Sequence, residues 1–216
     1  MLVTPITGAS SPGRTSRGLD ALATVTLSEP NQRILDGASR ASGGDPAWRA
    51  RKRAEAHDLL ALSQIAPPGR LAVEMLDLRE SLRSLLLMRV PVPCLPDTKN
   101  ELRVADHAQL GLVYPREVLH ECLPGPSFIQ VLHPWGVWHA NVGAGEQPLC
   151  LGPVLPRNIP VRELVLMSYN ALAMITHQVN EADEAGVFNV EAARWWAANL
   201  YRLPLTKTPF LENDAA

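Results

Sequence analysis

A histidine, an asparagine and a cysteine lie close together in HANVGAGEQPLCLG, residues 139–152. Cysteine is the strongest nucleophile among the uncharged side chains, because a few per cent of its thiol is already ionised near neutral pH. Gly143 and Gly145 favour a loop around Cys150 rather than a regular core element. The side-chain amide of Asn141 can donate to the oxyanion of an acyl transfer, which is typically worth about 3 kcal/mol. The segment therefore predicts acyl chemistry on Cys150, with Asn141 stabilising the oxyanion.

A second interpretation of this segment is a cysteine hydrolase, which needs a histidine base and a residue that orients it. His139 and His133 are the available bases. His139 lies so close to Asn141 that we expect their side chains to point to opposite sides of the chain, and the sequence offers no orienting residue. His139 is therefore expected to be structural. Without catalysis, Cys150 would be a buried structural thiol and Asn141 a turn residue before Gly143.

Metal ligation is a further interpretation of the cysteines and histidines. The three cysteines, Cys94, Cys122 and Cys150, form no C-x-x-C pair, which argues against a zinc knuckle or a dithiol redox site. His120, Cys122 and His133 also match no zinc-module spacing. We therefore predict no metal and no cofactor.

The composition of the 216 residues narrows the class of protein. With 46% hydrophobic residues the chain can build a core, and a formal net charge of −2 gives no electrostatic reason to bind nucleic acid. No apolar run reaches the ~18 residues of a membrane span, and the N-terminus lacks the order of a signal peptide. We therefore expect a cytoplasmic protein that binds neither nucleic acid nor membrane.

Arginine outnumbers lysine by 17 to 3 in this chain. Such a ratio is typical of a GC-rich bacterial genome. A surface poor in lysine also suits an enzyme that carries an amine-sensitive acyl intermediate.

Two regions differ in composition. Residues 1–45 are rich in Gly, Ser, Thr and Pro, which predicts a flexible or partner-docking extension. Residues 46–212 carry the apolar patterns of a folded domain. Asp45 as a cap and Pro46 at the first helical position begin a helix there, and Pro-Pro-Gly at 67–69 stops it.

The segments after this helix have strand character. Apolar residues recur with strand-like patterns, and turns separate four segments, at 70–76, 82–95, 107–115 and 127–134. A single helix over 70–89 is an alternative, since these residues also fit a period of 3.6.

Two apolar helices are expected after the cysteine, at 161–179 and at 189–203, the second with Asn189 as its cap. Trp195 and Trp196 are adjacent on this second helix, so they cannot both face the core. The order of elements predicts an α+β fold: an N-terminal helix, a four-stranded antiparallel meander, an active-site loop and C-terminal helices.

The order of these motifs resembles that of ubiquitin-conjugating enzymes. His139-Ala140-Asn141, followed after eight residues by Cys150-Leu151, is similar to the family's His-Pro-Asn and Cys-Leu. The other similar pieces are LGLVYP at 110–115, PGPSFIQVL at 124–132, the apolar helix at 161–179 and VFNVEAARWW at 187–196. Five similar segments in the family's order, over about residues 47–205, indicate the family more specifically than any single segment does.

The resemblance implies a role for each candidate residue. Cys150 would carry the C-terminus of a ubiquitin-like protein as a thioester, Asn141 would bind the oxyanion or brace the loop, and His139 would lock the loop. A thioester is already activated, so no general base has to adjoin the cysteine. Some family members use a later acidic residue to help deprotonate the incoming amine, and Asp183 and Glu184 lie in that neighbourhood.

The chain departs from the family at three places. Ala140 replaces the proline, the spacing to the cysteine is one residue longer, and GPVLPRNIP stands where the family has a tryptophan. Together with the arginine-rich composition, these departures indicate a divergent bacterial member of the kind encoded in antiphage defence operons. The expected partners are a ubiquitin-like protein, an adenylating activating enzyme and a protein target. A non-catalytic module that binds a ubiquitin-like protein is an alternative function, as is the hydrolase.

Overall fold

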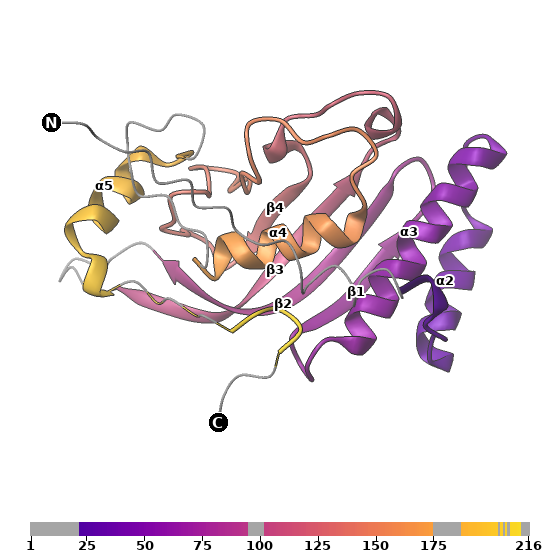
Figure 1. Ribbon diagram of the computed structural model, residues 1–216, viewed down its shortest axis with the longest axis horizontal. Coiled ribbons are helices and arrows are strands. Elements are labelled where there is room, and N and C mark those ends of the chain that lie inside the picture. Colours follow the sequence, from indigo (N-terminus) through magenta and orange to yellow (C-terminus); the bar gives the residue numbers. More distant parts are fainter. Residues whose placement is uncertain are drawn as a thin grey trace, which may run out of the picture.

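The computed structural model describes residues 22–94, 102–174, 187–202, 204, 206 and 208–212. Over these residues the chain has an α+β fold, in which four α-helices accompany a four-stranded antiparallel sheet (Figure 1). The predicted α+β class with a four-stranded antiparallel sheet is therefore confirmed.

The sheet is a meander in which each strand pairs with the next one along the chain. Its strands are β1 (Leu71–Asp77), β2 (Leu82–Cys94), β3 (Arg103–Tyr114) and β4 (Ile129–His133). The alternative of one helix over 70–89 is wrong. Side chains of β2 alternate between buried and more exposed positions, the period of two that a sheet with one face on the core requires.

Helix α3 (Pro46–Ile65) begins and ends where the sequence predicts. The Asp45 side chain accepts a hydrogen bond from the Trp48 backbone N–H at 3.0 Å, which satisfies one of the amides left free at a helix N-terminus. The chain leaves the helix at Ala66, directly before Pro67.

Helix α4 (Val161–Leu172) is shorter than the predicted 161–179. It ends in a turn in which Met174 has a φ of 57°, and residues 175–179 lie outside the described residues. An apolar pattern continues past this point in the sequence, so the pattern alone could not place the end.

Helix α5 (Val190–Ala198) starts at its predicted cap, because the Asn189 side chain accepts from the Ala192 N–H at 3.0 Å. Trp196 is fully buried and Trp195 is partly exposed, as their adjacency predicts. The short 3₁₀ helices are η1 (Leu22–Thr24), η2 (Arg116–Leu119), η3 (Gly125–Ser127) and η4 (Leu200–Arg202). Within the described ranges, no helix has both the length and the apolar character needed to cross a membrane.

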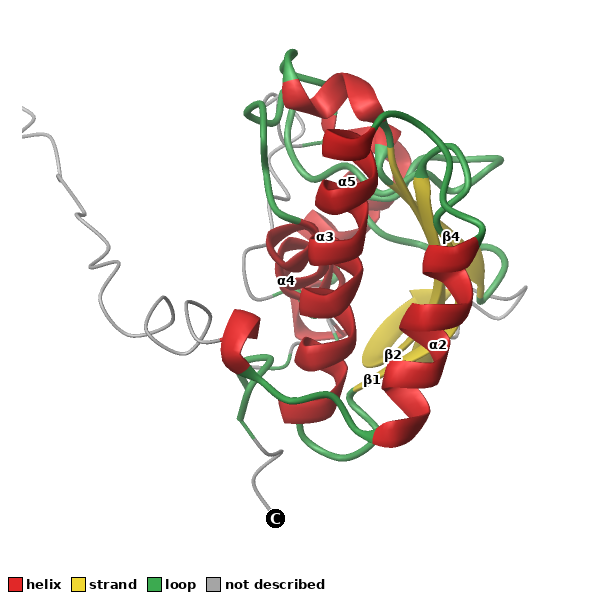
Figure 2. Cartoon of the chain, turned by 90° about the vertical axis from the view of Figure 1, so that its right-hand side faces the viewer, coloured by secondary structure: helices red, strands yellow, loops and turns green. Residues whose placement is uncertain are grey.

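Helices α3 and α4 pack against each other and cover one face of the sheet, α3 over β1 and α4 over β2 (Figures 1 and 2). The core lies between these layers and includes Leu86 and Leu110, which face each other across β2 and β3 and are fully buried. On the other face of the sheet, Met75 and Val113 stay exposed.

The expected extension over residues 1–45 is corrected in part. Residues from 22 onward are folded: α2 (Glu29–Arg40) packs on α3 and β1, and Leu22, Leu27 and Leu35 are buried in the core. The Gly- and Ser-rich composition around this helix hid it, because the helix has few apolar residues and only Leu35 is buried. Residues 1–21 lie outside the described residues, and their docking role stays a prediction.

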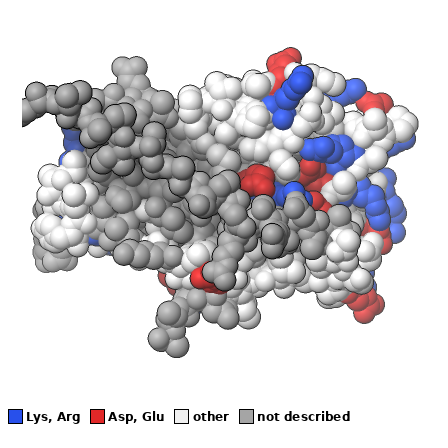
Figure 3. Space-filling view, viewed as in Figure 1, with Lys and Arg blue, Asp and Glu red and all other residues white. Residues whose placement is uncertain are grey.

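Polar contacts hold α2 against α3. Gln64 of α3 accepts from the Ser28 N–H at 2.8 Å and donates to the Thr26 carbonyl at 3.1 Å. Arg53 of α3 pairs with Asp36 of α2 at 3.0 Å. Figure 3 shows acidic and basic side chains gathered over these two helices.

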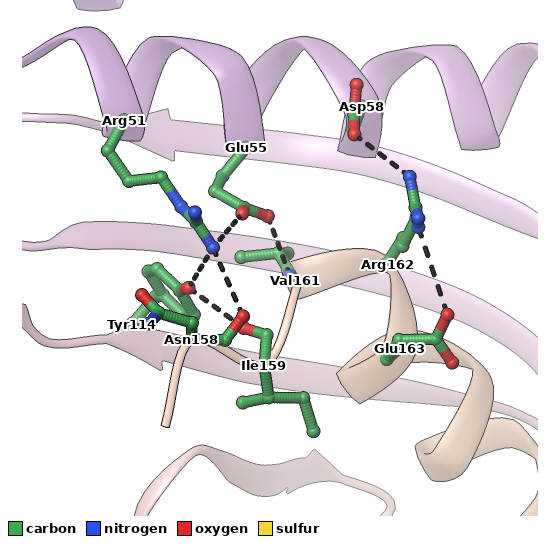
Figure 4. A network of polar contacts seen from close by, with 9 residues as sticks. All are labelled: Arg51, Glu55, Asp58, Tyr114, Asn158, Ile159, Val161, Arg162 and Glu163. Atoms are coloured by element: carbon green, nitrogen blue, oxygen red, sulfur yellow. Dashed lines mark hydrogen bonds and ion pairs between the residues drawn. The ribbon is translucent and has the colours of Figure 1, made fainter. Parts of the chain in front are cut away.

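A network of ion pairs and hydrogen bonds joins α3 to the start of α4 (Figure 4). Arg51 Nη2 lies 2.8 Å from Glu55 Oε1 and donates to the Tyr114 hydroxyl at 3.1 Å. Glu55 Oε2 accepts from the Val161 N–H at 2.7 Å, and the Tyr114 hydroxyl donates to the Ile159 carbonyl at 2.8 Å. The chain between Cys150 and α4 is therefore fixed by this network at the end that adjoins α4.

Glu55→Gln is expected to change how stability depends on pH. Burial raises the pKa of the Glu55 carboxyl above its usual 4.5, against the hydrogen bond from Val161 and the charge of Arg51. The folded protein then holds the proton more tightly than the unfolded chain, so this group lowers the free energy of unfolding as pH rises from 4.5 through the folded pKa. Urea unfolding of both proteins at several pH values should show the wild type losing stability relative to Glu55→Gln over that window. A difference that does not vary with pH would contradict the expectation.

Candidate active site

Asn141 and Cys150 lie opposite each other in a short hairpin. Val142 pairs with Leu149 in an antiparallel bridge, the Cys150 N–H donates to the Asn141 carbonyl at 2.7 Å, and the Gly143 N–H donates to the Pro148 carbonyl at 2.9 Å. Val142 and Leu149 are fully buried. Side chains alternate along a strand, so Asn141 and Cys150 share the opposite face, where cross-strand neighbours have Cβ atoms about 5 Å apart.

The hairpin extends the sheet beyond β4. Gln130 pairs with Pro148 in an isolated bridge, the Leu149 N–H donates to the Ile129 carbonyl at 2.9 Å, and the Val131 N–H donates to the Gln147 carbonyl at 2.9 Å. Backbone bonds to a core strand thus fix where Cys150 lies.

Cys150 is buried, with 8% of the residue exposed. Its sulfur donates a weak hydrogen bond to the Gly152 carbonyl at 3.6 Å. In the part of the chain that is described, no histidine nitrogen bonds to this sulfur. Of the other cysteines, Cys94 is buried and Cys122 is exposed. Burial raises the pKa of the Cys94 thiol, which makes it a poor nucleophile.

The carboxamide of Asn141 makes no hydrogen bond with the described residues. Its Oδ1 is buried and meets no donor among the described residues, and no acceptor among them bonds its Nδ2. A buried oxygen without a partner costs about 1–3 kcal/mol. The Nδ2 group of Asn141 is therefore not engaged by another described residue.

The buried ring of His139 supports the backbone of Asn141. The ring is fully buried, and its Nδ1 accepts a hydrogen bond from the Asn141 backbone N–H at 3.0 Å. A nitrogen that accepts a hydrogen bond carries no proton, so this contact requires the neutral ring. His133, the other candidate base, lies beside His107, with the two rings tilted by 33° and their centres 6.2 Å apart. The structure therefore brings Asn141 and Cys150 together, and His139 contacts the Asn141 backbone. Among the described residues, neither histidine forms a hydrogen bond with the Cys150 sulfur.

Gln147 is a site residue that the sequence did not reveal. It is 3% exposed and has a φ of 57°, which is uncommon outside glycine. Its Nε2 donates to the Val131 and Pro134 carbonyls at 2.9 and 3.0 Å, and its Oε1 accepts from the Val137 N–H at 2.8 Å. One side chain thus ties the hairpin to β4 and to the loop after it. The only signal in the sequence is its place before Pro148, which does not single it out.

The segment before α5 runs beside the hairpin. The Phe188 and Asn189 N–H groups both donate to the Ala140 carbonyl at 2.8 Å. The Phe188 ring covers Gly143 so closely that a Cβ there would lie 2.7 Å from a ring carbon. Asp183 and Glu184, the predicted acidic assistants, lie outside the described residues.

A contact between two glycines supports the turn after Cys150. A Cβ on Gly125 of η3 would lie 2.2 Å from the Gly152 carbonyl oxygen, the acceptor of the Cys150 thiol. Gly152 itself has a φ of 129°, in the region that favours glycine.

Gly125→Ala is expected to push the Gly152 peptide away and to cost about 1–3 kcal/mol of stability, the usual range for overpacking. Urea unfolding measures this loss. Gly37→Ala is the matched control, because nothing lies within 4 Å of its added methyl in α2 and alanine favours a helix by about 0.5–1 kcal/mol. Equal effects of the two substitutions would show that the glycine contact does not matter.

No family model, curated protein or solved structure matches this chain. In the described part of the chain, no three His, Cys, Asp or Glu side chains gather in a way that could hold a metal ion. A functional conclusion therefore depends on the geometry around Asn141 and Cys150.

Proposed function

We propose that the protein is a ubiquitin-conjugating-type transferase. It accepts a ubiquitin-like protein from an adenylating activating enzyme as a thioester on Cys150 and passes it to a protein target. The observation that carries this proposal is the hairpin register, in which Asn141 pairs with Cys150 through the backbone, so that the two side chains are expected on one face. The meander followed by a hairpin and then α4 supports a ubiquitin-conjugating-enzyme-like fold for residues 46–212.

Each of the two steps of the transfer forms one acyl bond and breaks another. In the first, the Cys150 thiolate attacks the carbonyl carbon of the incoming thioester, the oxyanion forms beside the Asn141 amide, and the thiolate of the activating enzyme leaves. In the second, an amine or hydroxyl of the target attacks the new thioester, loses its proton to solvent, and Cys150 leaves as a thiolate. His139 takes no proton in either step and holds the Asn141 backbone.

Lys52 supports the proposal, because an acylated cysteine needs surroundings without competing amines. It is the single lysine whose side chain the structure describes, and it is fully buried. Its Nζ donates to the Gly43 carbonyl at 3.0 Å, to the Arg79 carbonyl at 2.7 Å and to the Leu78 carbonyl. A lysine enclosed in this way cannot reach a thioester on Cys150.

Cys150→Ser, produced as a tagged full-length chain in the native host, tests the proposal. Serine would take the acyl group as an oxyester, which resists thiols, whereas the wild type would form a thiol-sensitive adduct and Cys150→Ala would form none. Mass spectrometry of the purified adduct identifies the modifier and the attachment residue.

The expected result is an adduct in which the C-terminus of a small protein is joined to the substituted side chain of the Cys150→Ser variant. Binding of a ubiquitin-like protein that survives Cys150→Ala, with no adduct in any of the three proteins, would favour a non-catalytic module. Turnover of simple amides by the purified wild type without partners would favour the hydrolase.

A further inference from the structure

A cavity of about 240 Å³ opens at the tip of the hairpin that carries Asn141. Its walls are two tryptophans, the loop between them, the hairpin tip and the cap of α5: Trp135, Gly136, Val137, Trp138, Gly143, Ala144, Gly145, Gln147 and Asn189. None of these side chains carries a charge. Trp135, which forms one wall of the cavity, is 68% exposed.

The walls of this cavity are held by contacts elsewhere in the fold. The Trp138 carbonyl accepts a hydrogen bond from Trp196 Nε1 of α5 at 2.8 Å, and the Trp138 N–H donates to the Pro93 carbonyl of β2 at 2.8 Å. Gln147 fixes the hairpin tip to the Val137 N–H. These contacts fix the loops beside α5 that line the cavity.

The cavity begins close to the candidate nucleophile. Gly143 lines it and lies two residues from Asn141 along the same strand, and Gln147 lies three residues before Cys150. A strand rises about 3.3 Å per residue, so the cavity spans roughly 7–13 Å from the Asn141–Cys150 pair. An extended chain attached to Cys150 covers that distance in two to four residues.

We propose that this cavity binds one neutral apolar side chain of the modifier's tail, two to four residues before the residue joined to Cys150. This inference rests on the proposed function and adds to it a specificity for the modifier's sequence. The volume suits one large side chain and is smaller than the roughly 300–1,000 Å³ of small-molecule and cofactor sites. The uncharged lining disfavours an acidic or basic residue, because a charge placed there would lose its water without gaining a partner.

Synthetic pentapeptide thioesters test this inference without the natural partners. The reference peptide is all glycine, and the others carry a single leucine, tryptophan, glutamate or lysine at the second, third or fourth position before the C-terminal glycine. Intact-mass spectrometry measures the rate at which each acylates Cys150 in the full chain. Leucine or tryptophan at one of these positions should raise the rate about 10-fold or more over all-glycine, as burial of one apolar side chain allows.

Two variants test whether the preference for leucine arises in this cavity. Trp135→Ala should bring the ratio of the leucine to the all-glycine rate close to one, whereas Tyr201→Ala should leave the ratio unchanged, because Tyr201 is 82% exposed and lies outside the cavity lining. Equal rates for every peptide, faster reaction of the charged peptides, or a leucine preference that survives Trp135→Ala would each overturn the inference while leaving the proposed function in place. Failure of every peptide to acylate Cys150 would instead count against the proposed function itself.

Discussion

Asn141→Ala is expected to slow acyl transfer onto Cys150 by about 100- to 1,000-fold, the usual cost of removing one oxyanion donor. The rate of Cys150 alkylation by iodoacetamide should stay unchanged, because alkylation passes through no oxyanion. The two rates are measured side by side by mass spectrometry, with a glycine-terminated peptide thioester as the acyl donor. Cys122 is the internal control, since it is exposed and should show no difference between the wild type and the variant.

The same substitution should leave the fold intact. The Asn141 carboxamide makes no hydrogen bond to the described residues, and its buried Oδ1 is without a donor, so its removal should not lower the free energy of unfolding. An equal slowing of acylation and alkylation, or a clear loss of stability, would show that Asn141 serves only to shape the loop.

Gln147→Ala is expected to cost about 2–4 kcal/mol of stability, because it leaves the buried Val131 carbonyl, Pro134 carbonyl and Val137 N–H without their partner. Urea unfolding followed by circular dichroism measures the loss. Gln130→Ala is the matched control: its Nε2 makes a single hydrogen bond, to the Glu146 carbonyl at 2.7 Å near the surface, and its loss should cost about 1 kcal/mol or less. Similar losses for the two variants would contradict the role of Gln147 as the tie between hairpin and β4.

Local patterns in the sequence predict much of the fold. The alternation in β2, the cap at Asp45 and the cap at Asn189 each depend on residues within one turn or one strand, and the structure confirms all three. Helix α2 was missed because its single buried residue, Leu35, is fixed by contacts with distant elements rather than by a local apolar pattern. The end of α4 was misplaced for the related reason that apolar residues continue past it.

In the candidate site, too, local sequence predicts some residues, whereas others depend on contacts between distant segments. Residue type and spacing single out Asn141 and Cys150, and the resemblance assigns His139 to support. The face that the two side chains share depends on the pairing of Val142 with Leu149, and a shift of one residue would turn them apart. Gln147 could not be found because its partners, from Val131 to Val137, become its neighbours only when the hairpin folds back on β4.

The nucleophile itself is tested most directly by exposing the full-length protein to an acetyl-Gly-Gly thioester at neutral pH and mapping the acyl group by mass spectrometry without reducing agent. We expect Cys150 to be acylated faster than Cys122 although it is far less exposed, and added thiol to remove the group again. Acylation of Cys122 with Cys150 left unmodified would contradict the proposal that Cys150 carries the modifier.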